Sequence, residues 1–260
     1  MSYPIPIVFD WLRELLWPLC RISAMVMVMT TISGSPVPSR VRLLLSVLIT
    51  AAVAPLLPKP PAIELFSVGA MLIVAQQLLI GITVGFVSLM VIQTFVLAGQ
   101  IIGMQTSLGF ASLVDPTSGQ QVPLVGQFYL LLMTLIFFTV NGHLLMITMI
   151  VESFYTLPIG ESLEPQSLKQ MADFGGKIFA NALTMSLSAV TALLLINFSF
   201  GVMTRAAPQL NIFAIGFPIT MLSGLLILWL TLDGVVPHFF RTWDAGQVII
   251  CDLLRLNCQI

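Results

Sequence analysis

Long stretches without charged residues set the strongest constraint on how this chain folds. The charged side chains leave six long uncharged stretches, which cover residues 22–39, 43–58, 66–114, 116–151, 178–204 and 206–232, with His143 inside the fourth. A helix needs about 20 apolar residues to cross the hydrocarbon core of a bilayer, and a charged side chain inside that core is costly. The stretches therefore predict membrane-associated helices separated by short polar connections.

The composition supports the same class of protein. Only 8% of the residues are charged and 58% are hydrophobic, whereas a soluble domain has about 25% charged residues. Ten basic and 11 acidic side chains are too few to cover a water-facing globule, which excludes a soluble enzyme, a disordered chain and a collagen-like fibre. The formal net charge of −1 provides no basic face, so we expect no nucleic-acid partner.

We expect an all-α, membrane-associated fold with about six long apolar helical segments. The segments are expected at about residues 6–32, 40–57, 66–105, 124–154, 167–203 and from 211 onward. The third segment would measure about 60 Å as one straight helix, which is twice the thickness of a bilayer core. We therefore expect this segment to tilt, to protrude from the bilayer or to break.

The basic residues predict an orientation for these segments. Arg40 and Arg205 lie in short connections, and the positive-inside rule places such connections in the cytoplasm. Alternation places the loop at 106–122 on the same side. The connectors that carry Lys59 and Glu161 then fall on the opposite side.

Small residues and amides in the third segment predict close helix packing. Gly81 and Gly85, and then Gly99 and Gly103, are four residues apart, which lets helix backbones approach closely. Amides in apolar segments need hydrogen-bond partners, and we interpret them mainly as links between helices, with the lining of a wet passage as the alternative. The amides are Gln76, Gln77, Gln93, Gln100, Gln105, Asn181 and Asn197.

The loop at 106–122 combines apolar and polar side chains between two very apolar segments. Phe110 and three aliphatic residues fall within seven positions of it, an exposure that is unusual for a solvent loop. Irregular backbone at membrane depth is tolerated only where protein buries it or where it lines a cavity. The loop could therefore fold inward as a plug, or lie at the interface with its apolar side chains among the headgroups; spacing alone favours the interfacial placement.

No catalytic, metal or cofactor site is expected. No serine, cysteine or carboxylate is spaced to make a base of His143 or His238, no metal-ligand set recurs at helical spacing, and no glycine-rich phosphate loop with a lysine occurs. We interpret His143 as a neutral structural residue that donates to a helix carbonyl, with a gating role as the alternative.

The three cysteines do not suggest a disulfide framework. Cys20, Cys251 and Cys258 form no ligand-like cluster, and their number is odd. One pair could still bridge, but we interpret all three as core or lipid-facing thiols.

Four sequence motifs resemble the flagellar biosynthetic protein FliR family. They occur in the order and at the spacing typical of that family, between about residue 17 and residue 233. They are residues 110–116 (FASLVDP), 141–143 (NGH), 156–160 (TLPIG) and 207–218 (APQLNIFAIGFP). The last motif is long and specific, whereas the second is short.

The resemblance implies a non-enzymatic subunit of the type III secretion export gate. One FliR-like subunit would join several FliP-like and FliQ-like subunits in a closed ring that passes unfolded flagellar proteins across the bacterial inner membrane, within the flagellar basal body. Residues 1–166 would form a FliP-like part, and residues 167–260 a FliQ-like hairpin with a C-terminal tail. The hairpin tip, with Arg205, Pro208 and Asn211, would face the cytoplasm near an FlhB-like switch protein.

The resemblance also implies a plug loop at 106–122 that seals the idle channel. Apolar side chains dewet a constriction, and glycines allow such a loop to swing. The plug residues would be Leu108, Gly109, Phe110, Ala111, Ser112, Leu113, Val114, Asp115 and Pro116. Gate subunits of this kind sit largely above the bilayer, so apolar length would report burial against partners as well as membrane crossing.

Three other functions remain open on the sequence alone. The first is the equivalent injectisome subunit, which would export virulence effectors. The second is a secondary transporter for a small solute, which would favour inverted repeats that we do not find. The third is an intramembrane enzyme, which would need a nucleophile and base or a metal site.

Overall fold

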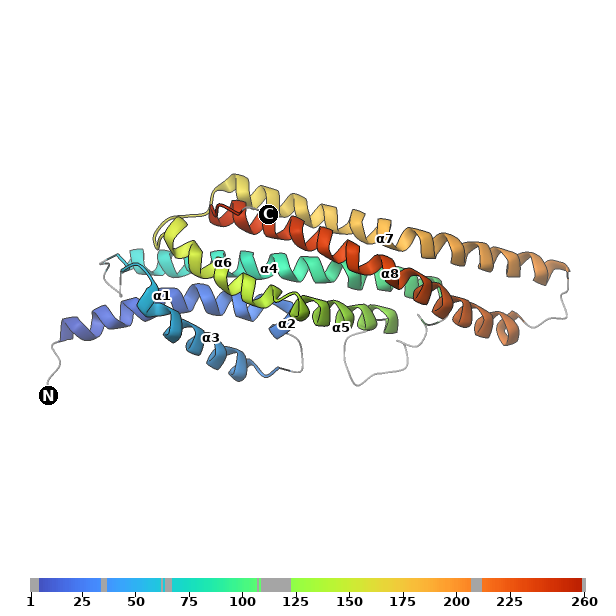
Figure 1. Ribbon diagram of the computed structural model, residues 1–260, viewed down its shortest axis with the longest axis horizontal. Helices are drawn as coiled ribbons and strands as arrows, with labels where there is room; N and C mark the ends of the chain where they lie inside the picture. The colour runs from blue at the N-terminus through green and yellow to red at the C-terminus, as the bar shows by residue number, and fades with distance from the viewer. Residues whose placement is uncertain are drawn as a thin grey trace. The chain divides into compact units, whose positions relative to one another are not determined.

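The computed structural model describes residues 5–33, 37–61, 63, 67–106, 108, 123–206 and 212–258. Every regular element in these ranges is a helix, which confirms the all-α prediction (Figure 1). The helices are α1 (Ile5–Val28), α2 (Thr30–Ser33), α3 (Ser39–Val53), the 3₁₀ turn η1 (Ala54–Leu56), α4 (Val68–Gln105), α5 (Leu124–Thr139), α6 (Gly142–Thr156), α7 (Pro165–Ala206) and α8 (Ile212–Leu254).

The described helices include four that are long and apolar enough to cross a membrane. These candidate spans are α4, α7, α8 and the stretch formed by α3 with η1; α5 and α6 together would make a fifth. The chain is therefore a membrane protein, with fewer candidate spans than the six segments expected. The first segment is not a candidate, because α1 carries four charged residues.

The fourth expected segment is not one continuous helix. The axes of α5 and α6 differ by 62° across a short break. Asn141 adopts a left-handed backbone conformation with φ of 57°, which interrupts the helical hydrogen-bond ladder. Gly142 follows, and a Cβ at this position would lie 2.5 Å from the ring of Phe137, so the bend depends on a glycine there.

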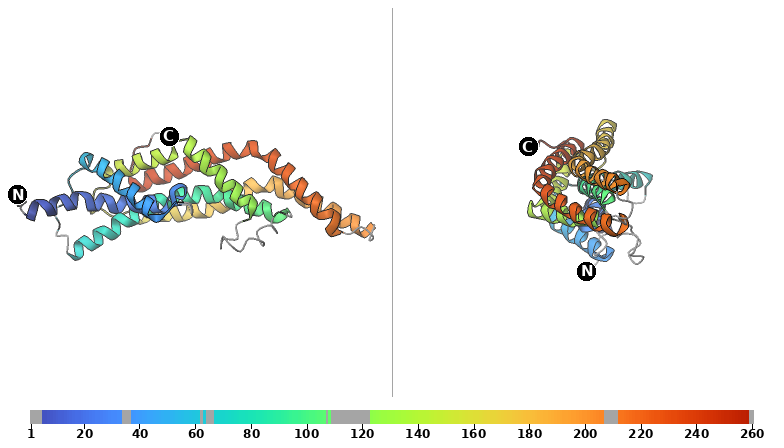
Figure 2. Two further views of the ribbon diagram at one scale, coloured as in Figure 1. Left: turned by 90° about the horizontal axis from the view of Figure 1, so that it is seen from below. Right: turned by 90° about the vertical axis from the view of Figure 1, so that its right-hand side faces the viewer.

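The chain forms two compact units. The first contains residues 1–90, 137–173 and 243–260. Within it, α3 packs on α1, and Figure 2 shows the two helices crossing. The first half of α4 also packs on α1: a Cβ on Gly81 would lie 2.2 Å from the carbonyl oxygen of Arg21, and one on Gly85 would lie 2.7 Å from that of Met25. At these two glycines the backbones of α4 and α1 lie so close together that a side chain on α4 would overlap the backbone of α1.

The second unit contains residues 91–136 and 174–242. Within it, α7 and α8 run antiparallel beside each other (Figure 1). The second half of α4 packs on α5 at Gly99, where a Cβ would lie 2.6 Å from the ring of Tyr129. The rings of Phe95 on α4 and Phe239 on α8 have centroids 5.9 Å apart. A Cβ on Gly103, in contrast, would meet only ordinary contacts at 3.5 Å.

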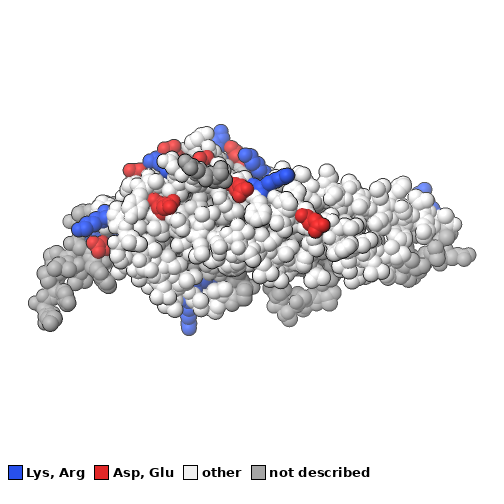
Figure 3. Space-filling view, viewed as in Figure 1, with Lys and Arg blue, Asp and Glu red and all other residues white. Residues whose placement is uncertain are grey.

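The apolar helices differ in what covers them. In the most apolar stretches, 72% of the residues of α4 are buried within the protein, against 28% for α7 and 17% for α8. A helix that is apolar on all sides and buried belongs to a protein core. On the face in Figure 3, the charged side chains gather mainly along the upper edge, and most of the remaining described surface is uncharged. The length of α4 therefore reflects burial by its neighbours, whereas α7 and α8 present apolar surface outward.

We predict that Gly81→Ala destabilises the fold, because the new methyl group overlaps the backbone of α1. Such overpacking costs about 1–3 kcal/mol. Gly103→Ala, on the same helix, should leave stability unchanged or raise it slightly through helix propensity. Thermal unfolding of the purified full-length protein in mild detergent would test the pair. Equal melting temperatures for the two variants would contradict the packing that we describe.

Candidate functional site

Most of the predicted plug lies outside the described residues. Leu108 is the exception: its side chain is only 6% exposed, so this apolar residue is covered by protein. Positions 109–116 are not described. At the expected hairpin tip, Arg205 is exposed in the last turn of α7, and Pro208 and Asn211 lie outside the described residues.

The end of α4 is anchored immediately before the loop at 106–122. The Asn197 side-chain amide on α7 donates to the carbonyl oxygen of Gln105 over 3.4 Å. Thr106 is buried and lies against Gly224 of α8, where a Cβ would come within 2.4 Å of the threonine methyl group. The loop therefore starts from a base held by α7 and α8, and the Asn197 contact confirms an amide acting as a link between helices.

A buried arginine joins three helices in the first unit. Arg21 on α1 is fully buried. Its Nε donates to Oε1 of Gln77 on α4 over 2.6 Å. Its Nη1 donates to the carbonyl oxygen and the hydroxyl of Ser153 on α6 over 3.1 and 2.9 Å, and its Nη2 donates to the carbonyl oxygen of Leu157 over 3.0 Å. The guanidinium also lies 4.2 Å from the ring centre of Phe154.

The arginine cation is balanced by a helix end. The described residues provide no carboxylate partner for Arg21, which instead binds the carbonyl oxygen of Ser153 in the last turn of α6 and that of Leu157 directly after the helix. The C-terminal end of a helix carries a partial negative charge, and it stabilises a cation placed in its last turn. A planar guanidinium can reach several acceptors in fixed directions, which a lysine ammonium cannot do. We infer that Arg21 has a structural role in setting the positions of α1, α4 and α6.

A polar pocket of about 230 Å³ lies in the second unit between α5, α7 and α8. Hydroxyl groups of Thr184, Ser188 and Thr231 line it, together with His238 and the buried Tyr129. The Tyr129 hydroxyl interacts with the side chain of Thr231 across this pocket. The pocket can hold several water molecules, and its lining contains no carboxylate or cysteine that could pair with His238 as a catalytic group.

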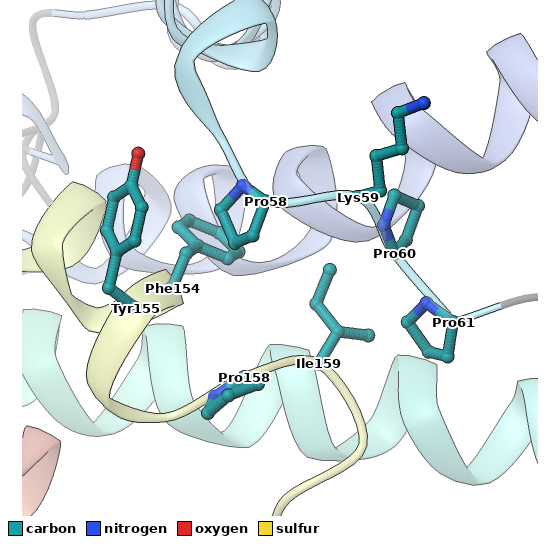
Figure 4. A pocket seen from close by; sticks show the side chains of 8 residues that line it. All are labelled: Pro58, Lys59, Pro60, Pro61, Phe154, Tyr155, Pro158 and Ile159. Atoms are coloured by element: carbon teal, nitrogen blue, oxygen red, sulfur yellow. The ribbon is translucent and has the colours of Figure 1, made fainter.

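A second, proline-rich pocket of about 160 Å³ lies in the first unit (Figure 4). Pro58, Phe154, Pro158 and Ile159 converge on it, while the ammonium group of Lys59 points away. The neighbouring Tyr155 hydroxyl donates to the carbonyl oxygen of Leu56. These contacts fasten the connector after η1 to the end of α6, and the apolar lining offers no catalytic group.

His143 does not make the hydrogen bond that we expected of it through Nδ1. This nitrogen is buried and has no partner within the described ranges. The imidazole instead packs on Phe138, with ring centroids 5.0 Å apart, because the bend at Asn141 places the two rings on the same side. His143 is therefore a packing residue at the bend in this structure.

The interpretation of the three cysteines as free thiols was wrong for two of them. Cys251 and Cys258 form a disulfide bond, whereas Cys20 is a half-buried free thiol. The two bonded cysteines are seven positions apart in the sequence, and a continuous helix would hold two such positions about 10 Å apart. The helix ends at Leu254, so the chain turns back and brings the two Cα atoms to 6.1 Å.

The fold and these sites define an all-helical membrane protein whose polar groups serve packing. No group of three potential metal ligands occurs within the described residues. The profile of the family described as bacterial export proteins, family 1, matches residues 12–246. The chain therefore belongs to this family of bacterial export proteins.

Named relatives agree with that assignment. The flagellar biosynthetic proteins FliR of Pectobacterium carotovorum subsp. carotovorum and of Escherichia coli (strain K12) are each 39% identical to the chain over 246 residues, with 94% of both chains covered. The FliR protein of Bacillus subtilis (strain 168) is 30% identical over 174 residues, which cover 65% of this chain and 67% of the relative.

We predict that Arg21→Lys and Arg21→Met both destabilise the protein, by on the order of 3 kcal/mol. Either change leaves buried acceptors of α4 and α6 without their donors. Arg40→Lys, at an exposed position at the start of α3, provides the control and should have no measurable effect. Thermal unfolding in detergent would measure all three variants. A melting temperature for Arg21→Lys equal to that of the parent protein would rule out the bridging role.

Proposed function

We propose that this chain is a subunit of the export gate of the flagellar type III secretion system. The observation that carries the proposal is the 39% identity over 94% of both chains to flagellar biosynthetic proteins FliR. Curated relatives from Caulobacter vibrioides and Aquifex aeolicus bear the same name, which favours the flagellar branch over an injectisome. The gate would lie in the bacterial inner membrane at the flagellar basal body.

The proposed assembly places one copy of this chain with several FliP-like and FliQ-like subunits. Residues 1–166 would act as the FliP-like part, and residues 167–260 as the FliQ-like hairpin with its tail. The long antiparallel pair α7 and α8 supports the second assignment. The hairpin tip at Arg205, Pro208 and Asn211 would face the cytoplasm, near an FlhB-like switch protein.

The outward faces of α7 and α8 support the need for partners. Large apolar side chains on both helices are exposed, and they include Phe179, Leu187, Leu195, Phe198, Leu222, Trp229 and Leu230. Surface of this extent is unfavourable in water and marks contact with lipid or with other proteins. A ring of subunits around an export pore would cover such faces on both sides of the chain.

The loop at 106–122 would seal the closed pore. A channel wide enough for an unfolded chain would leak protons when idle, and apolar side chains prevent this by dewetting the constriction. Leu108, Phe110, Leu113 and Val114 would form the seal, with Gly109 and Pro116 shaping the loop. The anchored end of α4 supports this role, because a plug needs a fixed base. The chain itself would act without catalysis, and other subunits would hydrolyse ATP and select substrates.

Native mass spectrometry of a tagged copy, purified from native membranes in mild detergent, tests the assembly. We expect one discrete complex with several FliP-like and FliQ-like chains and a single copy of this protein. Cells with an untagged copy provide the control for non-specific capture. A stable monomer or homodimer would contradict the proposal and favour the small-solute transporter.

Deletion of residues 110–116 tests the seal. We predict that the complex still assembles and that cells become permeable to ions, because the apolar constriction is lost. Membrane conductance or leakage of a small dye would measure this. Replacement of Thr117 and Ser118 by alanine, in the polar part of the same loop, should leave the membrane tight. An assembled deletion variant with unchanged conductance would disprove the sealing role.

A further inference from the structure

The end of α8 is built around a residue in an unusual conformation. Arg255 follows the last helical residue, Leu254, and has a φ of 55°. The backbone N–H of Leu256 donates to the carbonyl oxygen of Cys251 over 2.9 Å, which closes the helix end in the manner of a Schellman motif. Glycine usually occupies the left-handed position of this motif, so an arginine there is unusual.

The side chain of Arg255 binds the connector between α6 and α7. Its Nη1 lies 3.1 Å from Oε2 of Glu161, and its Nη2 lies 2.8 Å from Oε1 of Glu164. The Thr156 hydroxyl at the end of α6 donates to the carbonyl oxygen of Leu254 over 2.6 Å. Two contacts therefore hold the end of α8 against this connector and a third holds it against the end of α6, all within the first unit.

The disulfide fixes the same turn covalently. Cys251 lies in the last turn of α8 and Cys258 in the tail, so the bond spans Arg255. The arginine and its two carboxylate partners are each between 43% and 59% exposed, and exposed ion pairs contribute little stability alone. A disulfide restricts the alternative conformations of the enclosed segment, which keeps Arg255 in position for both glutamates.

We propose that Cys251 and Cys258 form an oxidation site on the extracytoplasmic side of the membrane, and that their disulfide locks the Arg255 clamp onto the α6–α7 connector. Disulfides persist in oxidising compartments and are rare in the cytosol. This side agrees with the proposed function, in which Arg205, at the other end of α7, faces the cytoplasm, and the assignment of the side rests on that proposal.

The oxidant is a protein with an exchangeable disulfide, of the dithiol–disulfide oxidoreductase class. A thiolate of the pair attacks the oxidant disulfide and forms a mixed disulfide, and the second thiolate then displaces the oxidant thiolate. The two cysteines lose two electrons and two protons, and the oxidant disulfide becomes a dithiol. Cys20, the remaining thiol, takes no part.

Counting thiols in native membranes tests the oxidation. The full-length Cys20→Ser variant is denatured and treated with a maleimide-linked polymer, with and without prior reduction. We expect no modified thiol before reduction and two after it. The further variants Cys251→Ser and Cys258→Ser should each show one thiol without reduction. Two modified thiols in the unreduced protein would overturn the proposal.

The side of the membrane is tested on intact spheroplasts of the same Cys20→Ser strain. After reduction with a membrane-impermeant phosphine, a membrane-impermeant maleimide should label the pair from outside. Labelling only after the membrane is broken would overturn the assignment. In cells that lack the extracytoplasmic dithiol–disulfide oxidoreductase, Cys251 and Cys258 should accumulate as free thiols. Complete oxidation of the pair in those cells would exclude this class of oxidant.

Hydrogen exchange tests the clamp. Exchange at residues 157–164 should rise several-fold in Cys258→Ser and to a similar degree in Arg255→Gln, whereas Cys20→Ser should match the parent protein. Unchanged exchange in Cys258→Ser would show that the disulfide does not hold the clamp. Thiol labelling and exchange do not depend on export, so these outcomes are separate from those that test the proposed function.

Discussion

The hydrogen bonds of Arg21 are the interaction on which the first unit depends. A cation is seldom buried without a carboxylate partner, because its desolvation is costly. Here the cost is offset by four directed hydrogen bonds, two of them to carbonyl groups at the end of α6. The same arginine lies where Gly81 lets α4 approach α1, since the carbonyl oxygen of Arg21 is the atom nearest to that glycine. Close backbone contact and a buried charge thus fix the same crossing.

The class of fold and most helix ends could be predicted from the positions of charged and proline residues. The uncharged stretches mark α3, α4, α7 and α8 because a charge inside a span is costly, and this holds whatever the helices pack against. The bend at Asn141 was missed for a related reason. Glycine is common inside membrane helices, so an Asn-Gly pair in an apolar stretch does not by itself signal a break. The bend depends on the fit between Gly142 and Phe137, which is a tertiary contact.

The polar sites could not be predicted, because their members are far apart in the sequence. The partners of Arg21 are 56 to 136 residues away, and those of Arg255 are more than 90 residues away. The type of residue narrowed the possible environments of Arg21 only in part. A charged residue next to an uncharged stretch can lie at a helix end in water, or it can be a buried cation. The disulfide was missed because its spacing suits a bond only where the helix stops. The burial of Leu108 likewise depends on contacts that the spacing of residues in the sequence does not determine.

Apolar helices of similar composition serve two purposes in this chain. Helix α4 is covered by its own neighbours, whereas fewer than a third of the residues in the most apolar stretches of α7 and α8 are buried. The free energy gained by burying α4 is therefore realised when the chain folds, and that available from α7 and α8 is realised only against lipid or other subunits. Such a chain buries α4 by its own folding but leaves the apolar surfaces of α7 and α8 to be covered by lipid or by other subunits. That property suits a protein that acts within an assembly, because each added neighbour covers apolar surface without altering the packing of α4.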